Sequence, residues 1–271
     1  RAGTMTLSAT DPNTLWVAFG HQNNDGVKIF KTTNGGQSWQ NLSTPTLNGH
    51  SIQYIFHQAG SNGAVYAGTN YAVFYRDDSM SDWEPYYEGL PASANCNIIR
   101  PFYKENKLRM ATYSHGIWET DLKTPSAPLA QPMADKLTAY CARDTFYFED
   151  YSVLRHAGAT WQWSFPGAAF VSDANARNPK VVFGQTGVFD VSLTITDAAG
   201  MSSTKIVPGM IRIETDGCSP DTIPGQALRL GGATSDFAVG PALNTPMTHF
   251  TVSAWIKRNG PQPAFAGLFF T

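Results

Sequence analysis

Charged residues and long apolar runs are both scarce in this chain of 271 residues. Charged side chains make up only 15% of it, the formal net charge is −2, and Lys and Arg are scattered rather than clustered. A protein that binds nucleic acid needs a basic surface, so we expect no nucleic-acid partner. A membrane-spanning helix requires a run of about 18 apolar residues. No such run occurs, so we expect no membrane span in this sequence.

Helical periodicity is also nearly absent, and short strand-like segments take its place. Aromatic residues form 13% of the chain, and Gly, Pro, Asn and Asp interrupt the apolar segments at short intervals. This pattern predicts an all-β fold. The length fits about two domains, each able to bury a core of its own. Residues 1–4 read as the interior of a longer protein, so the absence of a signal peptide does not bear on localisation.

Residues 32–39, Thr-Thr-Asn-Gly-Gly-Gln-Ser-Trp, read as a tight hairpin turn that ends in a tryptophan. The side chain of Asn34 can accept bonds from backbone N–H groups of the turn, and glycines such as Gly36 adopt positive φ without steric cost. Trp39 is large enough to fill a gap between packed sheets. With Thr32, these residues resemble the Asp-box, or BNR repeat, of sialidase-like and sortilin-like β-propellers, with Asn in place of Asp. The resemblance implies structural roles for all four residues.

A degenerate second copy of this motif stands at residues 76–83. Asp78 and Trp83 occupy the Asp and Trp positions, while the Ser/Thr and Gly positions are lost. We interpret Asp78 as the turn residue of this second box. The two tryptophans lie 44 residues apart, within the roughly 40–50 residues of one four-stranded propeller blade. A third strand unit, 98–119, ends in a segment similar to the closing phrase of such propellers. We therefore expect residues 1–123 to form the last two to three blades of a propeller whose earlier blades lie outside this sequence.

A Pro-rich segment, 124–128, marks the boundary to a second module at 126–216. Here apolar and polar residues alternate over several short segments, which predicts a β-sandwich with one buried face per sheet. The phrases at 148–152, 161–167, 178–179 and 187–200 together resemble a PKD domain, which has an Ig-like sandwich fold. One departure is that the family's W-D-F-G-D-G stands here as Trp-Ser-Phe-Pro-Gly, so roles of the family's turn aspartates are not carried over.

A third module is expected from a second boundary near residues 216–224. The segments 225–232, 236–239 and 250–257 resemble the opening strands of a laminin-G-like, concanavalin-A-type jelly roll. The resemblance covers residues 224–271 only, so we expect a truncated start of that fold.

The three cysteines are Cys96, Cys141 and Cys218. Cys141 lies in the first strand region of the sandwich segment, and Cys218 lies just past its last strand. First and last strands of a sandwich often run near one another, so we predict a Cys141–Cys218 disulfide, which would indicate an oxidising compartment. Two unpaired, buried thiols are the alternative. Cys96 is expected to be a small buried hydrophobic residue near the propeller rim.

The search for catalytic residues names none. The sialidase resemblance implies three arginines on a substrate carboxylate, with Tyr and an acidic residue nearby. The propeller-like part holds Arg76, Arg100 and Arg109, followed by Tyr113 and Glu119, but their spacing matches no motif. We interpret them as surface or strand-edge charges. Glycosidases also need two carboxylates that flank the bond, and no pair can be chosen.

Metal and cofactor sites are not expected either. The six histidines show no ligand spacing, and the sequence has no Cys-x-x-Cys motif. Ca²⁺ bound by loop oxygens of the sandwich segment is the alternative. Its candidate ligands would be Asp144, Glu149, Asp150, Asp190 and Asp197. Acidic residues at strand ends are usually solvated turn formers, which is the interpretation we prefer.

Aromatic residues offer candidate ligand-binding groups, because sugar rings stack on exposed Trp and Tyr faces. Trp161 and Trp163 point the same way on one strand, and we expect both to be core residues. The remaining candidates for ligand binding are Tyr86, Tyr87 and Trp255, whose side chains we expect to be more exposed.

The module order resembles that of large secreted or surface proteins, especially those that Bacteroidetes export by the type IX system. The resemblance implies an extracellular binding or adhesion protein, in which propeller and jelly roll recognise glycan or protein and the PKD module is a spacer. A rival interpretation is the accessory part of a secreted glycoside hydrolase with catalytic residues mostly upstream. A third is a sortilin-like propeller with a peptide ligand. Facing carboxylates in a complete propeller would distinguish them. The ligand, the blade number, the anchoring and the oligomeric state are not set by this sequence.

Overall fold

The computed structural model describes residues 2–21, 23–24, 26–91 and 93–214. The predicted third module, 224–271, lies outside the described residues, and so do Trp255 and Cys218. Within the described part, all regular structure is β-strand apart from two short 3-10 helices, η1 (Pro45–Leu47) and η2 (Tyr103–Glu105). Neither helix is long or apolar enough to cross a membrane. The predicted all-β class is confirmed.

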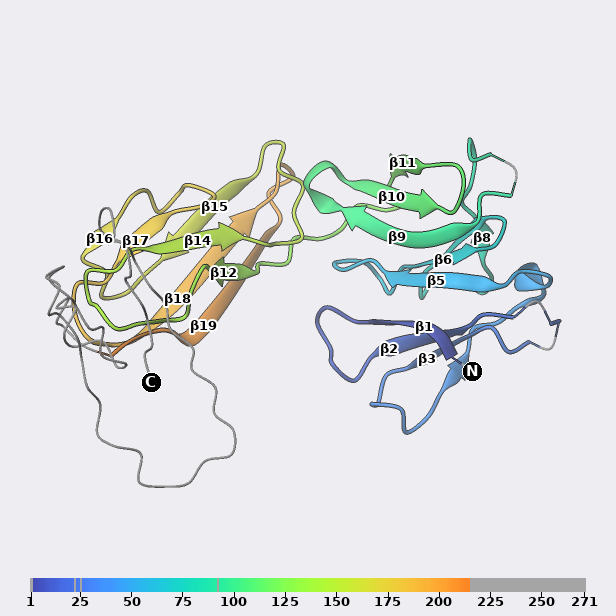
Figure 1. Cartoon of the computed structure of the whole chain (residues 1–271), viewed down its shortest axis with the longest axis horizontal. Coiled ribbons are helices and arrows are strands. Elements are labelled where there is room, and N and C mark those ends of the chain that lie inside the picture. Colours follow the sequence, from blue (N-terminus) through green and yellow to red (C-terminus); the bar gives the residue numbers. More distant parts are fainter. Residues whose placement is uncertain (1, 22, 25, 92, 215–271) are drawn as a thin grey trace, which may run out of the picture. The chain divides into compact units, whose positions relative to one another are not determined.

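Three small antiparallel sheets follow one another along the first half of the chain (Figure 1). In each sheet the strands pair in chain order. The strands of sheet 1 are β1 (Ala2–Leu7), β2 (Leu15–Phe19), β3 (Ile29–Thr32) and β4 (Gln40–Asn41). The strands of sheet 2 are β5 (Ile52–His57), β6 (Val65–Thr69), β7 (Val73–Arg76) and β8 (Glu84–Pro85). The strands of sheet 3 are β9 (Cys96–Phe102), β10 (Lys107–Thr112) and β11 (Ile117–Asp121).

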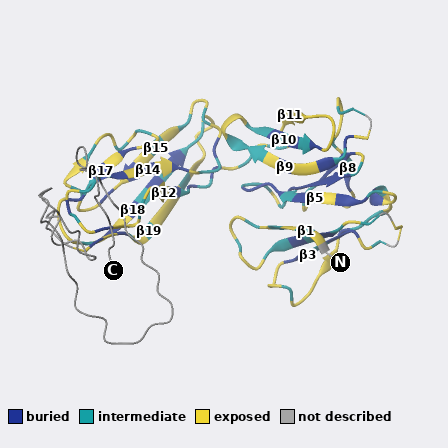
Figure 2. Ribbon diagram, in the orientation of Figure 1, coloured by how far each residue is buried: buried dark blue, intermediate teal, exposed yellow. Residues whose placement is uncertain are grey.

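The first strands of these sheets, β1, β5 and β9, lie beside one another. Sheet 2 therefore stands between sheet 1 and sheet 3, and both of its faces are covered (Figure 2). Consecutive four-stranded sheets with neighbouring first strands are the arrangement of propeller blades.

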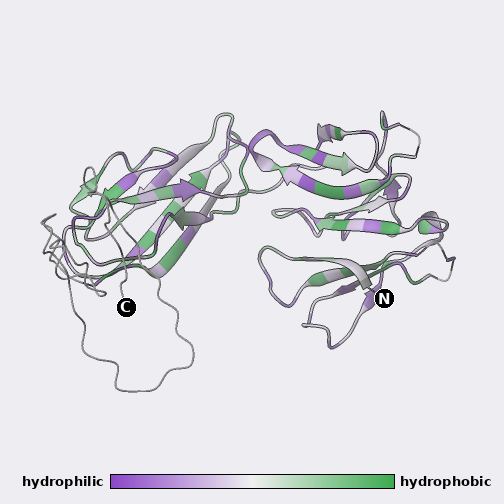
Figure 3. Ribbon diagram, viewed as in Figure 1, coloured by the Kyte–Doolittle hydropathy of each residue, from purple (hydrophilic) through white to green (hydrophobic). Residues whose placement is uncertain are grey.

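The two faces of sheet 2 follow from the period-2 geometry of its strands. One face, with Ile55, Ala67 and Phe74 in register, packs on sheet 1. The opposite face, with Tyr66 and Tyr75 in register, packs towards sheet 3. Because both faces are covered, all five residues of β6 are buried rather than every second one, although the strand mixes hydrophobic with weakly polar residues (Figure 3).

Sheets 2 and 3 approach closely at Gly68. A Cβ atom there would lie 2.2 Å from the sulfur of Cys96, so only glycine fits opposite that side chain. Cys96 is a buried free thiol, as expected for a small hydrophobic residue, and burial raises its pKa to about 12. The residue therefore has a packing role between sheets.

Two further sheets form a sandwich after residue 129. One consists of β12 (Pro132–Ala134), β14 (Phe146–Asp150), β17 (Lys180–Val182) and β16 (Phe170–Val171), in that spatial order. The other consists of β13 (Thr138–Ala139), β19 (Ser202–Ile213), β18 (Gly187–Thr196) and β15 (Thr160–Ser164). All pairings are antiparallel except β13 with β19, which is parallel.

The sandwich core comes from the alternation seen in the sequence. Phe189, Val191, Leu193 and Ile195 of β18 are buried on one face. Trp163 is buried as expected, whereas Trp161 is only partly buried and donates its indole N–H to Asp150 at 2.8 Å. The prediction that both tryptophans are core residues is therefore right for one and only partly right for the other.

Two of the acidic residues considered for calcium, Asp190 and Asp197, accept hydrogen bonds from backbone N–H groups. Asp190 accepts the backbone N–H of Gly209, and Asp197 accepts those of Ala199 and Met201. Among the described residues, no group of three or more acidic, histidine or cysteine side chains is placed to hold a metal ion.

Candidate functional site

The first Asp-box forms a hydrogen-bonded turn between β3 and β4. The hydroxyl oxygen of Thr32 accepts the N–H of Gly36 at 3.0 Å, and the Thr32 hydroxyl donates to Oδ1 of Asn34 at 2.8 Å. The same Oδ1 accepts the N–H of Ser38 at 2.9 Å. Gly36 has φ +91°, a value that a side chain would resist. Oδ1 of Asn34 thus accepts two hydrogen bonds within the turn.

Trp39 is not wedged between sheets, contrary to the expectation. Its side chain is 44% exposed, and its ring lies near the turn residue Gly36. Trp39 stands just before β4, on the face of sheet 1 that turns away from sheet 2. Within the described residues no sheet covers that face, so Met5 and Leu7 are exposed there as well.

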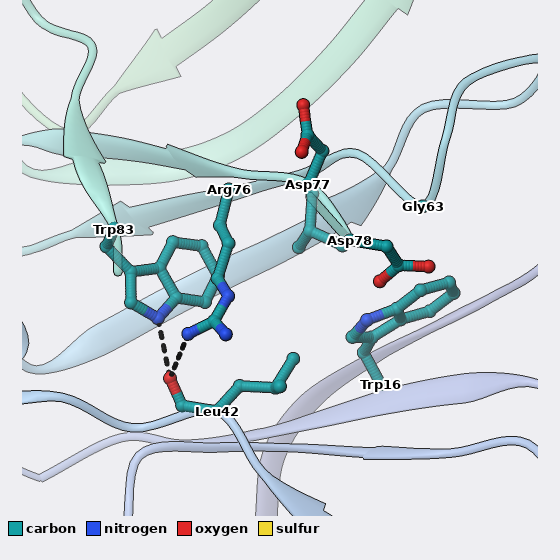
Figure 4. A pocket seen from close by; sticks show the side chains of 8 residues that line it. Trp16, Leu42, Gly63, Arg76, Asp77, Asp78 and Trp83 are labelled. Atoms are coloured by element: carbon teal, nitrogen blue, oxygen red, sulfur yellow. Dashed lines mark hydrogen bonds between the residues drawn. The ribbon is translucent and has the colours of Figure 1, made fainter. Parts of the chain in front are cut away.

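Trp83 holds the equivalent position in sheet 2 and does lie between sheets. It is only 4% exposed, and its indole N–H donates to the carbonyl oxygen of Leu42 in sheet 1 at 2.8 Å (Figure 4). The guanidinium of Arg76 donates to the same oxygen at 3.3 Å. The second box therefore docks sheet 2 on sheet 1, and we call this contact region the seam.

Asp78 does not act as the turn residue of the second box, which corrects the interpretation made from sequence. The neighbouring Asp77 accepts the N–H and hydroxyl of Ser79 instead, and these bonds lower the pKa of Asp77. The carboxylate of Asp78 crosses the seam, and both of its oxygens lie 2.7 Å from Nζ of Lys31. The carboxylate of Asp78 therefore pairs with the ammonium of Lys31 rather than with backbone N–H groups of its own turn.

Lys31 is buried in the seam on the β3 strand of sheet 1. Its ammonium lies 5.0 Å from the centre of the Trp16 ring, so it combines an ion pair with a cation–π contact. The Trp16 ring stacks on His57 with a centroid distance of 4.4 Å. Nδ1 of His57 bonds to the carbonyl oxygen of Ala64, while burial lowers the pKa of the imidazole. His57 is therefore neutral at physiological pH.

A water-sized cavity of about 10 Å³ lies beside these residues (Figure 4). Trp16 lines it, and the buried indole N–H of Trp16 has no hydrogen-bond partner among the described residues. A buried donor of this kind is usually satisfied by an ordered water. The seam is thus a polar interface inside an otherwise apolar stack of sheets.

A cluster of aromatic rings lies at the opposite end of sheet 2, near the start of β5 and β7. The His50 ring is 4.8 Å from Phe74 and 6.2 Å from Tyr71, and Phe74 is 6.1 Å from Tyr87. Phe74 is buried, whereas Tyr71 and Tyr87 are 49% and 43% exposed. We call these four residues the tyrosine cluster. It presents two anchored phenol rings to solvent.

The candidate ligand-binding residues from the sequence separate into two environments. Tyr87 belongs to the tyrosine cluster. Tyr86 instead packs with Tyr66 and Tyr75 between sheets 2 and 3, and its hydroxyl donates to the carbonyl oxygen of Asp121. Burial raises the pKa of Tyr86. Tyr86 is thus less open than expected, and Trp255 lies outside the described residues.

The arginines considered for a substrate carboxylate do not converge. Arg76 belongs to the seam, while Arg109 pairs with Glu119 at 2.6 Å and lies over the Phe102 ring. Arg100 faces the Tyr54 ring. The contacts of Arg109 and Arg100 agree with the interpretation of surface or strand-edge charges, whereas Arg76 lies between two sheets.

Of the predicted Cys141–Cys218 disulfide, only Cys141 lies among the described residues. Cys141 is disulfide-bonded, but its predicted partner Cys218 lies outside the described residues, so the pairing itself stays a prediction.

The sequence analysis missed Lys31, His57, His50 and Tyr71. A lysine and a histidine inside otherwise apolar strands were the available signals for the seam. For the tyrosine cluster, the available signal was Tyr71, an aromatic residue in the tight turn at 70–72.

Comparisons with known proteins give no family assignment. No family model matches the chain, and no curated protein does. The extracellular domain of BT4673, a one-component system protein of B. thetaiotaomicron, is 12% identical with a TM-score of 0.34, over 80% of this chain and 31% of that one. YCF48 from Cyanidioschyzon merolae is also 12% identical with a TM-score of 0.34, over 72% of this chain and 66% of that one.

The PKD1 domain of Vibrio anguillarum Epp is 24% identical with a TM-score of 0.25, over 33% of this chain and 98% of that one. At these TM-scores the likenesses carry no argument about function. The chain spans about a third of the length of the BT4673 domain.

Proposed function

We propose that this chain is part of an extracellular modular binding protein, in which the tyrosine cluster of sheet 2 recognises a glycan. In this proposal residues 1–123 are propeller blades of the Asp-box type, and residues 126–216 are a PKD-like spacer. Residues 224–271 begin a laminin-G-like module. The observation that carries the proposal is the pair of half-exposed rings, Tyr71 and Tyr87, anchored on His50 and Phe74.

Anchored tyrosines suit recognition for a physical reason. A phenol ring offers a large apolar face and a polar hydroxyl, and only two side-chain torsions must be fixed on binding. Contact with Phe74 and His50 already restricts these torsions in the free protein. The ordering that opposes binding is therefore reduced. Sugar rings present both C–H faces and hydroxyls, which match the two parts of the phenol.

Three acidic side chains of the propeller-like part are unsuited to act as the proton donor of a glycosidase. A glycosidase needs one carboxyl whose pKa is raised so that it can donate a proton. The environment lowers the pKa of Asp11, Asp77 and Asp82 through hydrogen bonds from neighbouring hydroxyl and N–H groups. These three groups are held ionised and are poor proton donors at neutral pH.

The location outside the cell is also part of the proposal. Cys141 is disulfide-bonded, and disulfides persist mainly in oxidising compartments. The Cys141–Cys218 pairing would close a loop around the sandwich module. Mass spectrometry of the non-reduced protein tests this pairing directly.

A glycan array tests the proposed function when release of sugar is monitored alongside. We expect retention of one or more glycans without hydrolysis. Tyr71→Ala and Tyr87→Ala should each weaken retention about tenfold, equivalent to about 1.4 kcal/mol. Tyr113→Ala is the matched control, because Tyr113 is 78% exposed and lies outside the cluster.

Three outcomes would contradict the proposal. Release of sugar would favour the glycoside hydrolase interpretation. If Tyr71→Ala and Tyr87→Ala both retain glycan as well as the unaltered protein does, the glycan-binding site lies outside the tyrosine cluster. If Tyr71 and Tyr87 bind a protein ligand and no glycan is retained, the tyrosine cluster is a binding surface for protein rather than for glycan.

A further inference from the structure

A pocket of about 370 Å³ opens at the Asp-box end of the seam. Its residues come from the loop between β1 and β2, the loop between β5 and β6, the turn after β3, and the polar seam itself. Those that could contact a ligand through polar side chains include Thr10, Asp11, Lys31, Thr33, Ser61 and Asp78. Small-molecule sites occupy about 300–1,000 Å³, so this pocket suits a small ligand.

The mouth of the pocket carries hydroxyl groups. Thr10 and Thr33 are exposed there, and the hydroxyl of Thr10 lies 3.4 Å from the hydroxyl of Ser8. Ser61 lies deeper and uses its hydroxyl to bond to the backbone carbonyl of Gln58. A hydroxyl both donates and accepts, so these walls match a ligand that does the same.

Lys31 and Asp78 neutralise each other in the pocket, whereas Asp11 keeps its negative charge. Lys31 is held by both oxygens of Asp78. Asp11 accepts the hydroxyl of Thr14 at 2.6 Å and the N–H of Asn13 at 3.0 Å. These bonds lower the pKa of Asp11, so it stays an ionised acceptor. The carboxylate of Asp11 repels an anionic ligand, whereas a neutral ligand can donate hydroxyl protons to the remaining lone pairs of Asp11 and Asp78.

The floor of the pocket is formed by buried, stacked side chains. The stacked rings of Trp16 and His57 are buried beneath it. Gly63 has φ +64°, and a Cβ atom there would lie 2.2 Å from Oδ2 of Asp78, so the loop can approach the carboxylate only as glycine (Figure 4). A preformed pocket loses little conformational freedom on binding.

We propose that this pocket binds a neutral, hydroxyl-rich small molecule of about the size of one sugar unit. The hydroxyls of Thr10 and Thr33 and the carboxylates of Asp11 and Asp78 supply its hydrogen bonds. The site lies at the opposite end of sheets 1 and 2 from the tyrosine cluster. It is therefore independent of the glycan-recognition proposal, and either can fail without the other.

Titration of the whole 271-residue chain with neutral monosaccharides, followed by NMR, tests the proposal. The probes are glucose, galactose and N-acetylglucosamine, with glucuronate and glucosamine as charged comparisons. We expect saturable shifts at His57, Thr10 and Thr33 with at least one neutral sugar. Glucuronate, which Asp11 repels, should bind about tenfold more weakly. Glucosamine should bind no more tightly than the neutral sugars, because Asp11 is open to solvent and its attraction for a cation is screened.

Two variants narrow the mouth without touching the buried seam. Thr10→Tyr and Thr33→Tyr should each abolish the shifts at His57, while Thr138→Tyr, an exposed position on β13, should leave them unchanged. Tyr71→Ala and Tyr87→Ala should also leave them unchanged, because those residues belong to the other site.

Absence of saturable shifts with every neutral sugar would overturn the proposal and indicate a pocket filled only by water. Shifts that persist in both Thr10→Tyr and Thr33→Tyr would also overturn it. Tighter binding of glucosamine or glucuronate than of any neutral sugar would contradict the assigned ligand class.

Discussion

The indole N–H of Trp83 in sheet 2 donates to the carbonyl oxygen of Leu42 in sheet 1 at 2.8 Å. Leu42 follows β4, the outermost strand of sheet 1, and β4 is only two residues long. The bond therefore fixes one sheet against the next at the place where strand pairing is weakest. Trp39, at the equivalent position of the first box, makes no such bond among the described residues.

Trp83→Phe tests the contribution of this bond. The phenyl ring keeps most of the buried apolar surface, but the donor is lost and Leu42 keeps only the longer bond from Arg76. We expect a loss of about 0.5–1.5 kcal/mol in the free energy of unfolding, measured in urea. Trp39→Phe is the control and should change stability by less than about 0.5 kcal/mol, as exposed substitutions do. Equal losses for both would show that the seam bond contributes nothing.

The Lys31–Asp78 pair should be strongly coupled. Asp78→Ala leaves a buried ammonium without its carboxylate, and we expect a loss of about 1–3 kcal/mol. The double variant Lys31→Met, Asp78→Ala should recover much of this loss. Lys31 is the buried partner, 10% exposed against 45% for Asp78, and methionine leaves no unpaired charge at that position. A double-mutant cycle in urea measures the coupling.

The exposed pair Lys123–Glu84 is the matched control for that cycle, since both side chains are at least a third exposed. Glu84→Ala should lower stability by less than about 1 kcal/mol. A coupling for Lys31 and Asp78 no larger than that for Lys123 and Glu84 would mean that the seam pair is not effectively buried.

Gly68→Ala should separate sheets 2 and 3. The added Cβ would lie 2.2 Å from the sulfur of Cys96 and 2.9 Å from Ile99, so the sheets must move apart. We expect a loss of about 1–3 kcal/mol, the usual range for overpacking. Gly3→Ala on β1 is the control, because its Cβ would meet only ordinary contacts from 3.4 Å. A stability loss at Gly3 as large as at Gly68 would contradict the close approach of the two sheets.

Stability should fall when the pH drops below about 6.5, the ordinary pKa of histidine. Burial lowers the pKa of His57, His50 and His156 in the folded protein. Between the lowered folded value and 6.5, the unfolded chain binds more protons than the folded one, so stability rises with pH. The stability that these groups contribute is complete above that window and is lost as the pH falls through it.

His57→Phe isolates the contribution of one histidine. The ring stack on Trp16 is kept, and the carbonyl oxygen of Ala64 still accepts the N–H of Gln58. The difference in stability between about pH 7.5 and about pH 5.5 should shrink in this variant. An unchanged difference would show that His57 titrates in the folded state as it does in the unfolded chain.

Local features of the fold could be predicted from sequence, whereas contacts between sheets could not. The turn at Thr32 and Asn34 depends on bonds within eight residues, and β18 alternates along its own length. Asp78 stands where a turn residue belongs, but a cation on another sheet decides its partner. The exposure of Trp39 and the burial of Tyr86 depend in the same way on which sheet lies against each ring.

The most direct test of the stacking of sheet 2 on sheet 1 is hydrogen exchange followed by NMR. The rates to compare are those at which the indole N–H protons of Trp83 and Trp39 exchange with solvent deuterium. Trp83 should exchange slowly, because its N–H is buried and bonded to Leu42, and Trp39 should exchange as fast as a free indole. Rapid exchange at Trp83, at a rate equal to that of Trp39, would contradict a tryptophan that docks one sheet on the next.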